Sequence, residues 1–202
     1  MNRMGFVNFW LYKKQEFPLD HGHILLRGQN GSGKSITTQS FIPFILDGDR
    51  TPSRLDPFGS DARRMEYYFL GDGHDGREDE TGYLYLEFVK EDTKEYRTIG
   101  IGQRAKKGNS TLGFWGFVLM DGRRIGRDCS LCRRISNDAF RPLTKLECRD
   151  LIGTNNFFTE SQGDYKAAVN KYLFGFERME QFEQFIRLLI KVRAPKLSKE
   201  FK

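Results

Sequence analysis

The order of apolar and polar residues predicts an α/β beginning to the chain. Apolar residues in 5–12 predict a strand, and the short apolar run 23–27 predicts a second, buried strand. Residues 35–46 have apolar positions at helical spacing, and Pro43 is expected to end or kink this helix. Residues 47–61 are rich in Pro, Gly, Asp and Arg, which predicts a loop.

The middle of the chain has a different pattern. Three runs predict strands: 83–88, 95–103 and 113–120. Asp121 and Gly122 then form a strong turn signal before residues 123–125. Several short strands in succession, without helices between them, predict an antiparallel β section at about 83–127.

The last quarter predicts two helices, at about 164–193. Asp164 is a candidate N-cap for the first helix, and Gly175 closes it. The second carries apolar residues at helical spacing from Met179 onward, until Ala194 and Pro195 interrupt it. We expect the polar stretch 196–202 to be a junction within a longer protein.

Composition sets wide limits on the class of protein. A chain of 202 residues with 30% charged residues fits one folded domain. The formal net charge of +6 permits a polyanionic partner without requiring one. No apolar stretch approaches the roughly 20 residues of a membrane span, and no secretory signal is visible, so we expect a cytoplasmic protein with no membrane partner.

The chain has three cysteines, too few for a disulfide framework. Cys129 and Cys132 have the spacing of half a zinc site, and a complete site needs four ligands. The other candidate ligands are few: Cys148, His21, His23 and His74. We expect reduced thiols in or beside the core, with a zinc site as the alternative.

Residues 28–35 carry the clearest chemistry, because they match the Walker A pattern G-x-x-x-x-G-K-[ST]. Its glycines let the loop curl so that backbone amides face phosphate oxygens, and the following helix begins with a dipole that favours anions. Lys34 would reach the β- and γ-phosphates of ATP, and the Ser35 hydroxyl would ligate Mg²⁺. The predicted nucleotide-binding residues are Gly28, Asn30, Gly31, Ser32, Gly33, Lys34 and Ser35.

The acidic half of an ATPase site is not visible in this sequence. Hydrolysis needs a carboxylate at the end of a second apolar strand. Asp47 follows an apolar run, but that run belongs to the helix after the loop. Glu87 ends another apolar run, which reads as an alternating antiparallel strand. We therefore assign no catalytic residue here and expect the catalytic half elsewhere in a longer polypeptide.

Several segments together resemble a known family. The segments are residues 5–9, 26–35, 44–49, 52–58, 173–175 and 193–198. They are similar to the N-terminal ATPase head lobe of SMC, SbcC and MukB-like ABC ATPases. The run 52–58, Pro-Ser-Arg-Leu-Asp-Pro-Phe, is the most specific, and resembles the SbcC-like family that includes the SMC-like subunit of Wadjet plasmid defence systems.

The resemblance implies a P-loop NTPase fold in which residues 1–202 form one lobe of a split head. Its C-terminal helices would lead to a coiled coil, and a distant C-terminal lobe would carry the Walker B and signature motifs. The full-length protein would be an ATPase and this segment alone inactive. Expected partners are double-stranded DNA, accessory subunits and a second copy of the full-length protein, in nucleoid-associated cytoplasm. Plasmid defence, chromosome organisation and repair stay open as roles.

Two further candidates near the nucleotide follow from the resemblance. Gln162 is a candidate for the family's glutamine loop, and a polar loop residue is the alternative. Arg63 and Arg64 lie where such heads place an arginine-bearing loop, and surface charge is the alternative.

Basic residues between and after the predicted strands are candidates for contacts with DNA phosphates, which require no sequence code. Solubilising charge on turns is the alternative. The candidates are Arg104, Lys106, Lys107, Arg123 and Arg124.

Two other function classes remain as alternatives. A self-contained P-loop kinase or transferase would need the second acidic strand that is missing here. A non-hydrolysing interaction module that kept the fold would not need the intact Lys34 and Ser35.

Overall fold

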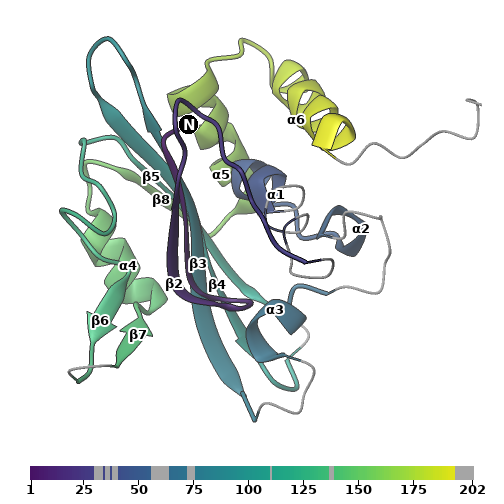
Figure 1. Cartoon of the computed structure of the whole chain (residues 1–202), viewed down its shortest axis with the longest axis vertical. Helices are drawn as coiled ribbons and strands as arrows, with labels where there is room; N and C mark the ends of the chain where they lie inside the picture. The colour runs from purple at the N-terminus through teal and green to yellow at the C-terminus, as the bar shows by residue number, and fades with distance from the viewer. Residues whose placement is uncertain are drawn as a thin grey trace, which may run out of the picture.

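The molecule is a mixed α/β fold built on a six-stranded antiparallel sheet (Figure 1). The computed structural model describes residues 1–29, 34, 37, 41–55, 64–71, 76–109, 111–136 and 139–193. The strand order is β2-β1-β3-β4-β5-β8. The strands are β1 Arg3–Phe9, β2 Tyr12–Pro18, β3 Asp79–Val89, β4 Tyr96–Lys106, β5 Gly113–Leu119 and β8 Phe157–Thr159. The predicted antiparallel section is confirmed, and the sheet also takes in the N-terminal hairpin.

The N-terminal hairpin corrects the prediction of one strand over 5–12. The chain turns at Trp10 and Leu11, and β2 pairs with β1 from Phe9 opposite Tyr12 to Arg3 opposite Pro18. Asn8 and Trp10 take positive φ angles of 46° and 55°. The turn therefore lacks the glycine that usually signals a hairpin, and β2 is a mostly polar edge strand without an alternating pattern.

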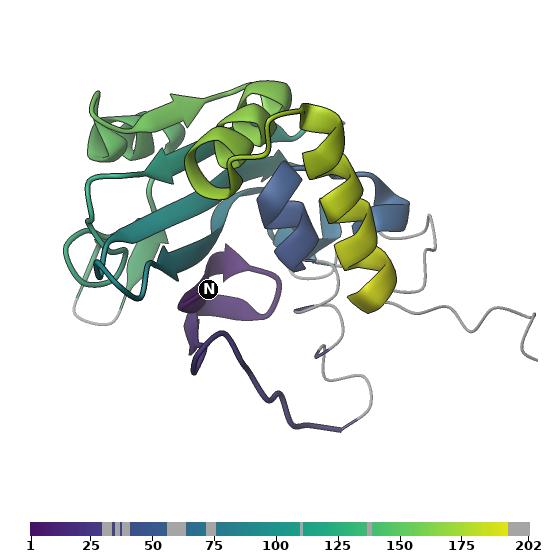
Figure 2. The same ribbon diagram turned by 90° about the horizontal axis from the view of Figure 1, so that it is seen from above.

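The strand predicted at 23–27 is wrong for this structure. His23 forms only an isolated bridge with Asp20, and the residues from Ile24 to Gln29 belong to no strand. Leu25 is 76% exposed. Both edges of β1 are already occupied by β2 and β3. Residues 23–27 therefore cannot pair with β1, and this part of the chain leads away from the sheet (Figure 2).

Helices cover one face of the sheet and enclose the larger core (Figure 2). They are α1 Phe41–Asp47, α2 Pro52–Leu55, α3 Tyr67–Leu70, α5 Gln162–Val169 and α6 Met179–Arg193. Every residue of α1 is buried. Pro43 does not end this helix, because it lies in the first turn of α1, where a missing N–H is tolerated.

The other face carries a smaller core around Tyr83, Tyr85 and Trp115. It is covered by α4 Lys145–Ile152 and by the two-stranded hairpin of β6 Cys132–Arg134 and β7 Phe140–Pro142 (Figure 1). A capping box starts α4: Thr144 accepts from the Glu147 backbone, and the Glu147 side chain accepts from Thr144. The predicted turn at Asp121 leads into no strand at 123–125, only into an isolated bridge between Ile125 and Cys129.

The C-terminal helices agree with the sequence except at their boundaries. Ser161, and not Asp164, caps α5, and Asp164 lies in its first turn. A π-helical turn, Asn170–Phe174, follows, and Gly175 closes it in the left-handed conformation with φ 73°. The interruption predicted at residues 194–195 lies outside the described residues. None of the described helices combines the length and apolar character needed to cross a bilayer.

Candidate functional site

Lys34 folds back across the beginning of its own loop. Its ammonium donates hydrogen bonds to the carbonyl oxygens of Gly28 and Gln29, at 2.6 and 2.7 Å. These contacts bring the two ends of the Walker A segment together, although they are six and five residues apart in sequence. A cation held beside the first residues of a Walker A segment is in place to meet an anion. The other predicted phosphate and magnesium residues, 30–33 and Ser35, lie outside the described residues.

The segment after Lys34 is attached to the N-terminal hairpin. Thr37 is fully buried, and its hydroxyl lies 3.0 Å from the Tyr12 hydroxyl on β2. Phe41, at the start of α1, packs edge-on against Phe9 and Trp10, with ring centroids 4.9 and 6.0 Å apart. The hairpin therefore positions the chain just beyond the loop, a role that the sequence did not predict.

The far end of α1 carries a fork of charged groups. Arg54 pairs with Asp47 at 2.9 Å and with Asp49 at 2.8 Å. Burial raises the pKa of Asp47, although Arg54 pulls it down. Asp47 is thus an ion-pair partner of Arg54. This fork joins two of the segments, 44–49 and 52–58, that carry the family resemblance.

Gln162 also lies at this end of α1, as the first residue of α5. Its amide nitrogen lies 3.5 Å from the carbonyl oxygen of Asp47, and its side chain packs over Gly48. Gln162 therefore contacts the C-terminal end of α1. A role in nucleotide binding for Gln162 stays a prediction.

Arg64 lies exposed beside a hollow of about 490 Å³, and Arg63 lies outside the described residues. Arg50 lines the same hollow; its guanidinium donates to the carbonyl of Leu112 at 3.2 Å and lies over the Phe114 ring. Burial lowers the pKa of Arg50. A nucleotide contact by either Arg63 or Arg64 stays a prediction.

Three of the five basic residues predicted to contact DNA are engaged within the molecule. Arg104 forms a fork with Asp79, at 2.5 and 2.7 Å. Arg123 donates to the carbonyls of Leu151 and Ile152, both at 3.0 Å.

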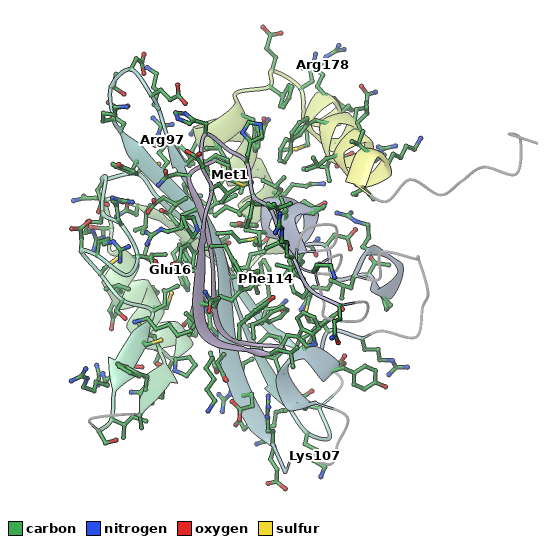
Figure 3. All side chains as sticks on the ribbon, viewed as in Figure 1. Met1, Glu16, Arg97, Lys107, Phe114 and Arg178 are labelled. Carbon is green, nitrogen blue, oxygen red and sulfur yellow. The ribbon has the colours of Figure 1, made fainter. Side chains whose placement is uncertain are left out.

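Arg124 is the third engaged residue. It pairs with Glu87 at 3.0 Å and lies over the ring of Tyr96, 4.1 Å from its centroid. The remaining two, Lys106 and Lys107, are exposed at the end of β4, where Figure 3 shows Lys107 at the tip of the sheet.

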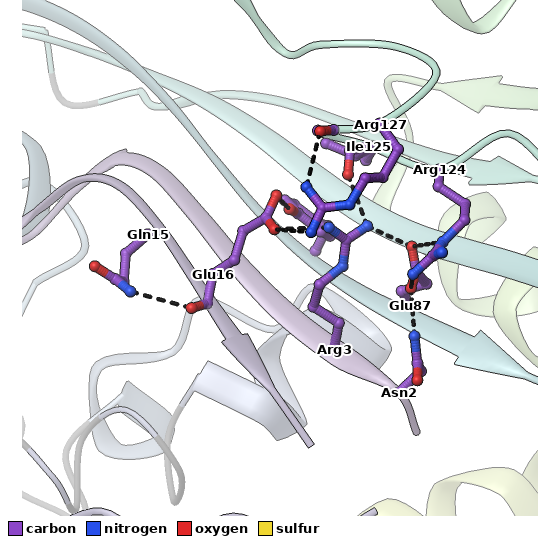
Figure 4. Close-up of polar contacts among 10 residues, drawn as sticks. Asn2, Arg3, Gln15, Glu16, Glu87, Arg124, Ile125 and Arg127 are labelled. Atoms are coloured by element: carbon purple, nitrogen blue, oxygen red, sulfur yellow. Dashed lines mark hydrogen bonds and ion pairs between the residues drawn. The ribbon is translucent and has the colours of Figure 1, made fainter. Parts of the chain in front are cut away.

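A buried ion cluster that sequence reasoning missed ties the 121–128 segment to the sheet (Figure 4). Arg3 on β1 pairs with Glu87 on β3 at 2.5 Å and with Glu16 on β2 at 2.7 Å. Its guanidinium also donates to the carbonyl of Ile125 at 2.7 Å. The sequence offers one sign of this cluster, the single arginine Arg3 in an apolar strand, and it does not indicate which residues Arg3 would pair with.

Glu87 is the centre of this cluster. Burial alone would raise its pKa, but hydrogen bonds from Arg124, Arg3 and Asn2 outweigh burial and hold the pKa of Glu87 below its ordinary value. The carboxylate therefore stays ionised although its side chain is 0% exposed. The cluster is a structural clamp, since each of its charges faces an opposite charge.

The cysteines lie in and around the smaller core. Cys148 is buried, and burial raises the pKa of its thiol to about 12. Cys129 and Cys132 are half-buried, and burial also raises the pKa of each. Within the described part of the chain, no group of three or more His, Cys, Asp or Glu residues is arranged to hold a metal ion.

In comparisons with known proteins, no family model and no curated protein matches this chain.

Proposed function

We propose that this chain is the ATP-binding N-terminal lobe of a split ABC-type ATPase head, of the SMC, SbcC and MukB kind. The observation that carries the proposal is the position of Lys34, whose ammonium lies on the carbonyls of Gly28 and Gln29 at the mouth of the Walker A loop. Each of these carbonyl oxygens carries only a partial negative charge. Phosphate oxygens carry full charge, so ATP with Mg²⁺ would displace the carbonyls from Lys34.

The position of the loop relative to the sheet favours a split head over a self-contained kinase. In a self-contained P-loop enzyme, the loop joins a strand of a parallel sheet to a helix. Here every strand pair of the described residues is antiparallel. The apolar run before the loop lies outside the sheet, with Leu25 exposed. A strand supplied by a C-terminal lobe would give that run a partner.

The wider role follows from the resemblance and is part of the same proposal. Two full-length copies would engage their heads around ATP, with accessory subunits, and act on double-stranded DNA. Plasmid defence, chromosome organisation and repair are the candidate settings. The coiled coil would begin beyond α6.

The experiment is a measurement of phosphate release from ATP by the purified chain, alone and mixed with the C-terminal lobe encoded by the same gene. Transfer to water needs a positioned nucleophile and a second set of charges on the γ-phosphate, which we expect the C-terminal lobe to supply. We expect trace turnover alone and Mg²⁺-dependent turnover with the second lobe, abolished by Lys34→Ala. Robust turnover by the chain alone that depends on Lys34 would favour the self-contained kinase or hydrolase.

A further inference from the structure

The hairpin of β6 and β7 presents an exposed aromatic ring among cations. Phe140 is 47% exposed. The ammonium of Lys14 lies 5.3 Å from the centre of its ring, and the guanidinium of Arg134 lies 5.4 Å from it. Arg134 is opposite Phe140 in the strand register, whereas Lys14 comes from β2, in another sheet. Two separate parts of the fold therefore place cations on one ring.

More positive charge surrounds this ring. Arg133 and Arg141 face each other across the hairpin, and Glu147 binds both, at 3.1 and 2.7 Å. Lys13 joins Lys14 in lining a hollow of about 430 Å³ beside Phe140. We call this surface the hairpin face; its residues are Lys13, Lys14, Arg133, Arg134, Phe140 and Arg141. Among the described residues, the carboxylates of Glu80 and Glu147 lie near it and are outnumbered by these cations.

We propose that the hairpin face binds single-stranded DNA, with a base stacked on the platform of Phe140 and Arg134. Strand binding without a sequence code combines a basic groove for the phosphates with aromatic rings for the bases. The guanidinium of Arg134 lies 5.4 Å from the centre of the Phe140 ring, and a planar guanidinium beside a ring can add its own flat face to a stack with a base. Duplex DNA would use the cations but would leave the exposed ring without a partner.

This inference extends the DNA partner of the proposed function to a surface built apart from the Walker A loop. Figure 1 shows β6 and β7 on the face of the sheet opposite α1. If the hairpin face does not bind single-stranded DNA, the proposal of nucleotide binding still stands, because an ATP titration of the same samples tests the Walker A segment separately.

The test is fluorescence anisotropy of a labelled 20-nucleotide oligothymidylate titrated with the chain. Phe140→Ala keeps the net charge, so we expect about a tenfold weaker affinity with an unchanged salt dependence. Arg134→Lys keeps the charge but loses the planar group, and we expect about a threefold loss. The matched control is Tyr67→Ala on α3, which removes a ring that is 51% exposed and should change nothing.

Because both side chains on the platform are exposed, the variants should keep the wild-type melting temperature. A duplex of the same length should bind more weakly, and Phe140→Ala should not affect it. The inference is wrong if the chain does not bind the oligothymidylate, if Phe140→Ala binds it as tightly as wild type, or if Tyr67→Ala loses as much affinity. Tighter binding of the duplex than of the single strand would also overturn it.

Discussion

Arg3 and Glu87 form an ion pair of 2.5 Å between adjacent strands, with side chains that are only 5% and 0% exposed. Arg124 adds a second cation to the same carboxylate, at 3.0 Å. A buried pair of this kind loses hydration on folding, and its retention depends on each charge keeping its partner. The N-terminal strand, the centre of the sheet and the 121–128 segment are therefore coupled through one carboxylate.

Replacing this carboxylate by its neutral analogue should be strongly destabilising. Glu87→Gln keeps the shape but leaves Arg3 buried without its main counter-charge, so we expect the free energy of unfolding to fall by about 3 kcal/mol. Urea denaturation of the purified chain measures this value. Glu91→Gln is the matched control, because that side chain is 80% exposed, and it should cost less than about 0.5 kcal/mol. Equal effects of the two changes would refute the clamp.

The same carboxylate should make stability depend on acid pH. Glu87 has a folded-state pKa below its ordinary value of 4.5, because hydrogen bonds from Arg124, Arg3 and Asn2 outweigh the effect of burial. Its stabilisation is thus fully present above the unfolded-state pKa and is lost as the pH falls through the folded-state value. The melting temperature of wild type should approach that of Glu87→Gln as the pH drops below about 4.5. A constant gap between the two proteins would contradict this.

The contact between the N-terminal hairpin of β1 and β2 and the residues after the Walker A segment is also testable. Tyr12→Phe removes the hydroxyl that lies 3.0 Å from the Thr37 hydroxyl and leaves the ring in place. We expect a loss of about 1 kcal/mol in the free energy of unfolding and a few-fold weaker ATP affinity, because Thr37 is three residues after Lys34 in the sequence. Tyr96→Phe, in which the hydroxyl lies far along the chain from the loop, is the control for ATP affinity. Unchanged ATP binding by Tyr12→Phe would limit the contact to a structural role.

Much of the fold could be predicted from the sequence where a segment is rich in buried apolar residues. β3, β4 and β5 were all found, because apolar side chains recur along each strand, and α6 was found from helical spacing. The edge strand β2 was missed because only one of its edges is paired and its residues are mostly exposed. Local propensity gives little signal for a strand whose register is set by its neighbour.

In the candidate site, too, local motifs could be predicted from the sequence, and contacts between residues distant in sequence could not. The Walker A loop is a local motif, so the sequence locates Lys34 directly. The apolar run 23–27 predicts a strand, but a strand also needs a pairing partner, and none of the six strands of the described sheet pairs with it. The engagement of Arg124 with Glu87 joins residues 37 apart in sequence, so no local pattern could separate it from the exposed Lys106.

A calorimetric titration of ATP with Mg²⁺ into the purified chain measures whether the Walker A segment, whose Lys34 contacts Gly28 and Gln29, binds the phosphates of ATP. We expect saturable binding by wild type, loss of binding in Lys34→Ala, and unchanged binding in the control Lys106→Ala, which removes an exposed lysine at the end of β4. Melting temperatures of the three proteins check that each is folded. Equal ATP affinity in wild type and Lys34→Ala would contradict phosphate binding by the Walker A segment.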